Sequence, residues 1–328
     1  MRWALIAIAL LFSSCLHGAA TLQQYPQLLD FPQTPPIVEG QWLGITTSEF
    51  ELDTDLPEEQ ARYAAEICMR EIAAIQAVMG NSEPPHQVPV RLIAMADSVA
   101  FDSKFSARVL ALSTWQHGQQ LLLLSGVPER WEHRASLVEG APATVTHEMA
   151  HVVLRRYFPV QPRWFAEGLA EYLASYKWSL DGSQVELGVA NLNAYAAYQH
   201  YRSVGLAEML DWGGASVADG EAAEASRYGY AWAFVHWMIH TQPQLFADAM
   251  RQIANGAGAI EQFDRELAPR GPEIDGAVHA YMKTGDYQTI FLPVKTSRHT
   301  AQVHPLTTEE RAQVDALIDA ASQGYRRK

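Results

Sequence analysis

Residues 144–151 read Thr-Val-Thr-His-Glu-Met-Ala-His, and the last five of them form the pattern H-E-x-x-H. Two residues four apart on an α-helix lie on one face, about 40° apart around the axis, so His147 and His151 can direct both imidazoles at one ion. Zinc accepts neutral imidazole nitrogens, and a catalytic zinc site keeps one position open for water. The carboxylate of Glu148 lies beside the two histidines and can take a proton from that water. This stretch therefore predicts a metal-binding helix that carries its own general base.

Two helices joined by a short turn are expected here. Apolar residues recur near helical spacing around the two histidines, and Pro159 and Pro162 mark the end of that helix. Residues 164–176 again repeat apolar side chains at intervals of three and four, which predicts a second helix. The second helix carries Glu167 and Glu171 one turn apart, and the two helices can fold back on each other.

These segments resemble the gluzincin metallopeptidases, which include thermolysin-like and aminopeptidase N-like enzymes. Residues 162–172 read Pro-Arg-Trp-Phe-Ala-Glu-Gly-Leu-Ala-Glu-Tyr. This run is similar to the Pro-x-Trp-x-x-Glu-Gly-x-Ala-Glu-Tyr pattern of the small peptidase MA-like domains of bacterial exported proteins. The strong part of the resemblance runs from His147 to Tyr172, and the rest of the chain is similar only loosely.

The resemblance implies a zinc site with defined roles. His147, His151 and Glu167 would hold one zinc ion per chain. Glu148 would be the general base, which later gives its proton to the leaving amine. Glu171 would lie behind the ligands and orient the imidazole of His147.

Glu167 and Glu171 are both candidates for the third metal ligand. Gly168 directly follows Glu167 as in the family pattern, and a glycine would let this helix pack closely against the metal helix. Glu167 is therefore the expected ligand. The alternatives for Glu171 are that it is the ligand instead, or that it is a solvated surface carboxylate.

A tyrosine that stabilises the oxyanion is expected on a later helix. Residues 226–232 read Ser-Arg-Tyr-Gly-Tyr-Ala-Trp, which resembles the tyrosine-led helix that follows the active site in related domains. The resemblance makes Tyr228 the candidate, with Tyr230 in reserve. The alternative is that both tyrosines only pack.

Residues 119–125 are predicted to form a strand shortly before the metal helix. Gluzincins place there the edge strand that binds the main chain of the substrate, because an extended peptide can add to a free sheet edge. The equally open alternative is an ordinary buried strand, since residues 121–124 are all leucine.

A second pair of histidines, His236 and His240, also lies four apart on a predicted helix. No carboxylate lies between them in the position that Glu148 has in the first pair. Packing is therefore the expected role of this pair, and metal binding is the alternative.

The composition is that of a globular protein with an acidic surface. The chain has 328 residues, of which 48% are hydrophobic and 19% charged, and its formal net charge is −13. This length and composition are sufficient for a large buried core. The negative charge argues against nucleic acid as a partner, because no basic stripe is present to neutralise phosphates.

The chain is expected to divide into four parts. Residues 1–20 are an export signal, 21–40 a proline-rich arm, 41–190 an α+β metallopeptidase domain, and 191–328 a mainly helical lobe that completes the cleft. Strands are predicted at residues 42–52, 88–95 and 119–125, and a helix at 56–79. The predicted fold class is α+β and thermolysin-like, with a small mixed sheet packed on the H-E-x-x-H helix.

The first 20 residues determine the expected location. They carry one positive charge at Arg2, an apolar run, and then small residues, which is typical of a secretory signal. Two routes are open, simple cleavage before Thr21 or lipid attachment at Cys15. The mature chain is expected to have no transmembrane segment and to be periplasmic, attached to the cell envelope or secreted. Either route leaves Cys68 as the only unmodified thiol, on an apolar helical stripe that predicts burial.

The predicted function is an exported zinc-dependent peptidase. A non-catalytic zinc protein of gluzincin fold that binds peptides or a surface is the alternative from a different class. Hydrolysis of a non-peptide bond would use the same site. No exopeptidase motif for a free α-amine is recognisable, which favours internal cleavage.

Overall fold

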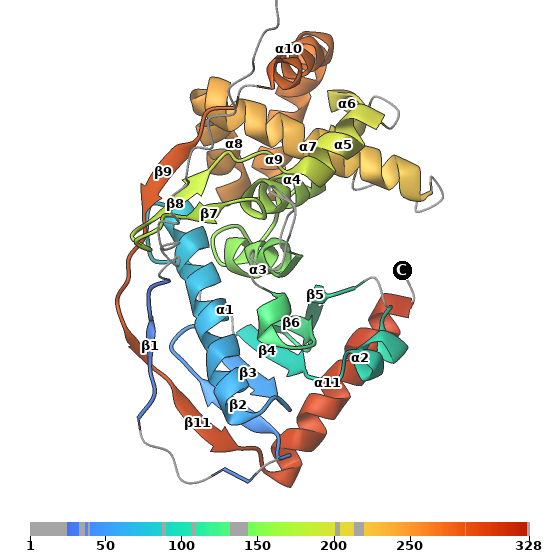
Figure 1. Ribbon diagram of the computed structural model, residues 1–328. Helices are drawn as coiled ribbons and strands as arrows, with labels where there is room; N and C mark the ends of the chain where they lie inside the picture. The colour runs from blue at the N-terminus through green and yellow to red at the C-terminus, as the bar shows by residue number, and fades with distance from the viewer. Residues whose placement is uncertain are drawn as a thin grey trace, which may run out of the picture.

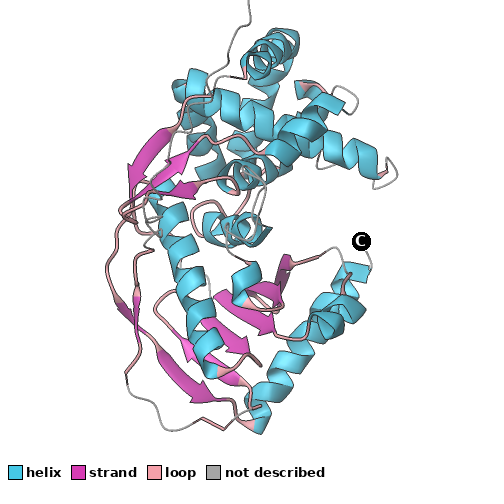
Figure 2. Ribbon diagram, in the orientation of Figure 1, coloured by secondary structure: helices cyan, strands magenta, loops and turns pink. Residues whose placement is uncertain are grey.

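The computed structural model describes residues 25–32, 37–38, 40–86, 90–106, 109–131, 144–200, 204–212, 220–285 and 287–326. The expected export signal and Cys15 lie outside the described residues. A mixed six-stranded sheet is followed by a largely helical C-terminal region, which confirms the α+β fold class (Figures 1 and 2).

The six-stranded sheet has the order β11-β2-β3-β4-β6-β5. Its strands β3, β4 and β6 run parallel, and the other neighbours pair antiparallel. The strands are β2 (Leu43–Thr46), β3 (Glu51–Thr54), β4 (Val90–Met95), β5 (Ala111–Gln116), β6 (Gln119–Ser125) and β11 (Gln302–Pro305).

The single strand expected at residues 42–52 is wrong, since this stretch is a hairpin of β2 and β3. The Thr47 hydroxyl accepts from the amides of Glu49 and Phe50 and turns the chain. For residues 119–125 the alternative of a buried strand is confirmed and that of an edge strand is not, because β6 is paired with β4 on one side and β5 on the other.

Helices cover both faces of the sheet. Leu122 and Leu124 of β6 join the core beneath α1 and α3, whereas Leu121 and Leu123 join the core on the side of α11. The run of four leucines therefore reflects a strand that is buried on both faces. The helices are α1 (Glu58–Val78), α2 (Ser98–Lys104), α3 (Thr144–Arg155), α4 (Arg163–Leu173), α5 (Leu192–His200), α6 (Leu206–Leu210), α7 (Glu221–Thr241), α8 (Pro243–Ala254), α9 (Ala257–Leu267), α10 (Gly271–Thr284) and α11 (Thr308–Arg326).

The end of the chain returns to the sheet instead of extending the helical lobe. Strand β11 pairs with β2, and α11 covers the sheet face opposite α1 (Figure 1). Before this return, β9 (Ile290–Pro293) joins β7 (Lys177–Trp178) and β8 (Gln184–Leu187) in a small sheet. Residues 191–328 therefore hold part of the sheet layer in addition to the expected helices.

The N-terminal arm is attached to the body of the protein. Strand β1 (Leu29–Asp30) pairs in parallel with β10 (His299–Thr300), and the Glu66 carboxylate accepts from the amides of Leu28 and Leu29. Cys68 on α1 is fully buried, as expected. Within the described part of the chain, no helix combines the length and the apolar character needed to cross a membrane.

Candidate metal centre

The centre is built on α3, which lies between the sheet and the C-terminal helices (Figure 1). Val145, Met149 and Val152 of α3 are buried in the core. His147 and His151 project from the other side of the helix and keep 14% and 18% of their side chains exposed. The amphipathic pattern of α3 thus turns both imidazoles toward α4.

Three ligand atoms converge at one point. The Nε2 atoms of His147 and His151 are 3.2 Å apart, and Oε2 of Glu167 lies 3.5 Å from the first and 3.3 Å from the second. Ligands bound at roughly 2.0–2.1 Å in a tetrahedron are separated by about 3.3 Å, so the triangle has the size that such an ion requires. His147, His151 and Glu167 form a group that could hold a metal ion.

The carboxylate of Glu167 supports this assignment. Its Oε2 atom is buried and faces the Nε2 atoms of both histidines, and a charged oxygen in this position is costly unless a cation lies beside it. Burial acts to raise the pKa of Glu167, but the hydrogen bonds and charges of the two histidines outweigh burial and hold this pKa far below its usual value. Glu167 is therefore ionised.

The electrostatics favour a positive charge at this point. Burial acts to lower the pKa of His147, but the hydrogen bond with Glu167 and the charges of Glu171 and Glu148 raise it to about 9. Three carboxylates thus surround one imidazole. A proton or a metal ion can supply the charge that they attract.

The structure also brings Glu171 to His147. Its Oε1 atom is 3.4 Å from Nδ1 of His147, the nitrogen on the far side of the ring from Glu167. The Glu171 side chain is 18% exposed, which does not fit a solvated surface carboxylate. Its other oxygen accepts a 2.6 Å hydrogen bond from the Asn191 amide. Asn191, which the sequence did not single out, also accepts from the backbone of Ala194 at the start of α5.

Glu148 lies on the side of α3 that faces the sheet. Its Oε2 atom accepts the backbone N–H of Ser113 in β5 at 2.8 Å. Strand β5 was not predicted from the sequence. It forms a hairpin with β6 through a two-residue turn of His117 and Gly118, both of which have positive φ. The strand beside the site is therefore β5, the last strand of the sheet order.

Tyr228 and Tyr230 take different places on α7. The ring of Tyr228 is 6.5 Å from that of His147, and the Arg163 guanidinium is close enough to act on the pKa of its hydroxyl. Burial and the charge of Glu167 raise the pKa of Tyr228, so its hydroxyl keeps its proton. The hydroxyl of Tyr230 is buried and donates to Asp275 on α10.

Gly168 has the role of a packing residue, but its partner differs from the expected one. A Cβ atom at this position would lie 2.5 Å from the carbonyl oxygen of Ala231 and 2.8 Å from Cγ2 of Val235. Both partners belong to α7, so the glycine allows α4 to approach α7 and not the metal helix. This close contact positions Tyr228 beside the site.

The second histidine pair has hydroxyl and carbonyl partners among the described residues. His236 Nε2 is 3.2 Å from the carbonyl oxygen of Gly188, and its Nδ1 is 2.9 Å from the hydroxyl of Tyr281. His240 Nε2 is 3.0 Å from the hydroxyl of Tyr172. Among the described residues, the group that could bind a metal does not include this pair.

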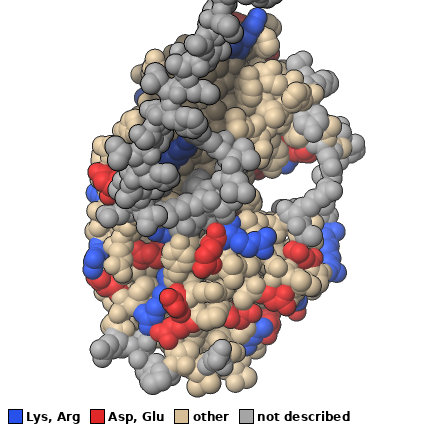
Figure 3. All heavy atoms as spheres, viewed as in Figure 1, with Lys and Arg blue, Asp and Glu red and all other residues tan. Residues whose placement is uncertain are grey.

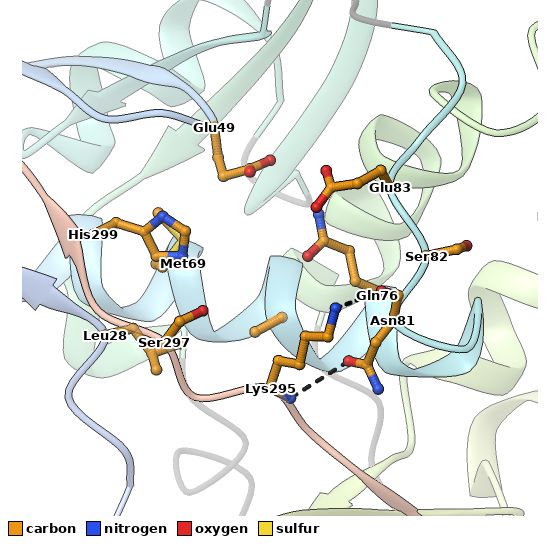
Figure 4. A pocket seen from close by; sticks show the side chains of 11 residues that line it. Leu28, Glu49, Met69, Gln76, Asn81, Ser82, Glu83, Lys295, Ser297 and His299 are labelled. Carbon is orange, nitrogen blue, oxygen red and sulfur yellow. Dashed lines mark hydrogen bonds between the residues drawn. The ribbon is translucent and has the colours of Figure 1, made fainter.

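A separate recess of about 80 Å³ lies between α1, the chain that follows it and residues 295–299 (Figure 4). Two of its charged groups are engaged within the protein. Glu49 forms a 2.6 Å ion pair with Arg156, and the Lys295 ammonium donates to the carbonyl oxygen of Asn81 at 2.9 Å. Nothing in its lining resembles the metal centre.

A protein-family model matches the part of the chain that contains the site, but its description gives no function. No curated protein matches this chain. Residues 141–257, which include α3, α4 and α7, match a family model described as a protein of unknown function, DUF1570.

Proposed function

We propose that this protein is an exported zinc-dependent peptidase. The observation that carries the proposal is the triangle of His147, His151 and Glu167, with the charge of Glu148 close enough to raise the pKa of His147. Two imidazole nitrogens and one carboxylate oxygen form a donor set that suits zinc. Export is supported by the signal-like composition of residues 1–20.

Hydrolysis requires that one water molecule be divided between the two products. Its oxygen bonds to the carbonyl carbon, the carbon–nitrogen bond breaks, and the amine leaves with an added proton. A zinc ion at this site would polarise the carbonyl and make a water more acidic. Glu148 would take the proton from the water and pass it to the amine nitrogen.

Two neighbours would assist this reaction. Tyr228 keeps its proton and lies beside His147, so its hydroxyl would donate to the oxygen that becomes negative in the transition state. Glu171 would hold the ring of His147 in one orientation through Nδ1.

The sheet edge favours a peptide as substrate. Strand β5 ends the sheet, and in its register with β6 the backbone N–H of Ser113 points outward, where Glu148 accepts it. An extended peptide could pair with this edge and place a carbonyl group above the metal centre.

The test compares the parent with Glu148→Gln. Both proteins are expected to bind one zinc ion per chain, since Glu148 is not in the ligand triangle. The parent should cleave peptides from a proteome digest in a chelator-sensitive manner. Glu148→Gln should be slower by roughly 100-fold or more, the usual contribution of a general base.

The outcome distinguishes two classes of protein. If parent and Glu148→Gln bind zinc and neither cleaves any peptide, the chain is a zinc-containing binding protein. If the two proteins cleave peptides equally fast, Glu148 is not the base and the proposed mechanism is wrong.

A further inference from the structure

An exposed tryptophan and an exposed arginine lie together beside the metal centre. Trp115 of β5 has 46% of its surface exposed, which is unusual for so large an aromatic side chain. The guanidinium carbon of Arg155 on α3 lies 5.8 Å from the centroid of the Trp115 ring. This arrangement is a cation–π contact at the surface.

Both residues lie on the two elements that form the site, Trp115 on β5 and Arg155 on α3. Trp115 follows Ser113 by two positions, so their side chains share one face of β5 about 7 Å apart. Arg155 follows His151 by four positions on α3, one turn beyond the ligand stripe. A chain that pairs with β5 above the metal centre would therefore pass over Trp115 and Arg155 within two residues.

Among the described residues, no carboxylate pairs with the charge of Arg155, and its guanidinium contacts the Trp115 ring. Arg163, on the other side of the centre, is 3.0 Å from Glu224 and stacks on Trp212. The chain has a net charge of −13, so a cation without a carboxylate partner among the described residues is unexpected near the three glutamates of the metal centre. Its charge is therefore available to a ligand.

We propose that Trp115 and Arg155 form a subsite for an acidic side chain of the peptide substrate. This inference rests on the proposed peptidase function and names its substrate preference. The guanidinium would pair with an Asp or Glu side chain within two residues of the cleaved bond. The Trp115 ring would hold the guanidinium in place and contact the apolar part of that side chain.

The experiment uses end-blocked octapeptides of alanine and serine that carry one Glu, Gln or Lys at each position in turn. Cleavage by the zinc-bound parent is compared with cleavage by Arg155→Glu. The matched control is Arg265→Glu, which makes the same charge change at an exposed arginine on α9. The parent and the control should prefer one Glu peptide to its Gln counterpart by about fivefold, as a partly exposed ion pair allows. Arg155→Glu should reverse this preference toward the Lys peptide.

A binding measurement separates this proposal from the function on which it rests. The same peptides are titrated into zinc-bound Glu148→Gln, with and without Arg155→Glu, and followed by tryptophan fluorescence. Tighter binding of the Glu peptide that disappears with Arg155→Glu supports the subsite, even if the parent cleaves nothing. The subsite is overturned if Glu and Gln peptides bind or react equally with the parent. It is also overturned if Arg155→Glu keeps the preference for Glu.

Discussion

Two pairs of histidines occur at the same spacing on two helices of this protein, and their surroundings differ. His147 and His151 on α3 face the carboxylate of Glu167. His236 and His240 on α7 stack at 4.5 Å between rings but meet hydroxyls and a carbonyl oxygen. The spacing brings two imidazoles together in both places, whereas the third partner decides whether an ion is stabilised there.

The pKa values show the same contrast. Carboxylates raise the pKa of His147 to about 9 against the effect of burial. Burial and the neighbouring His240 lower the pKa of His236 to about 3. His147 therefore lies where positive charge is favoured, and His236 lies where positive charge is excluded. Three experiments test this contrast.

The largest effect is expected for Glu167→Ala. Loss of the carboxylate leaves two imidazoles, a state that resembles the α7 pair, and zinc affinity should fall on the order of 100-fold or more. Competition with a colorimetric zinc chelator measures this change. Tyr172→Phe, which removes a partner of His240, is the matched control and should keep the parent affinity. Equal affinity of the parent and Glu167→Ala would show that Glu167 is not a ligand.

The second effect concerns pH and the α7 pair. His236 is neutral when folded, with a pKa of about 3, and its unfolded pKa is about 6.5, so the unfolded chain takes up the proton first as pH falls. The stability that this histidine contributes is present above pH 6.5 and should decrease by about 2 kcal/mol on lowering the pH to 5. Urea unfolding of the parent and of His236→Phe at both pH values isolates the contribution of His236 to the free energy of unfolding. The contribution of His147 cancels, because both proteins contain it. Identical pH slopes would contradict the neutral, buried state of His236.

The smallest effect is expected for Glu171→Gln. The amide keeps the size of the side chain but removes the charge near Nδ1 of His147, so zinc affinity should fall by about tenfold. Chelator competition again measures it. An affinity equal to that of the parent would mean that Glu171 does not orient the ligand.

The local patterns predicted the site better than they predicted its surroundings. The periodicity around His147 and Glu167 placed α3 and α4 close to their observed bounds, and β6 spans the predicted residues. These features depend on neighbours within a few turns of chain. The histidine spacing did not distinguish α3 from α7, but the carboxylates that follow α3 did.

The errors arose where contacts join distant parts of the chain. Strand β11 pairs with β2, and the local pattern of residues 302–305 does not predict that pairing. Gly168 packs against α7, a helix that begins more than 50 residues later in the chain. A pattern around Gly168 could not show which helix it would contact. The edge strand was assigned to residues 119–125 because the short, partly polar β5 has weak apolar periodicity.

The charged surface agrees with the composition. On the face shown in Figure 3, acidic and basic side chains of the described residues are interspersed, without a broad basic area. A polyanionic partner would require such a basic area.

Anomalous diffraction at the zinc edge, on crystals of the zinc-bound protein, would locate the metal ion. We predict one peak per chain, bonded to Nε2 of His147, Nε2 of His151 and Glu167 at roughly 2.0–2.1 Å. No peak is expected beside His236 and His240. A peak at the α7 pair, or none within the triangle of α3 and α4, would contradict the account.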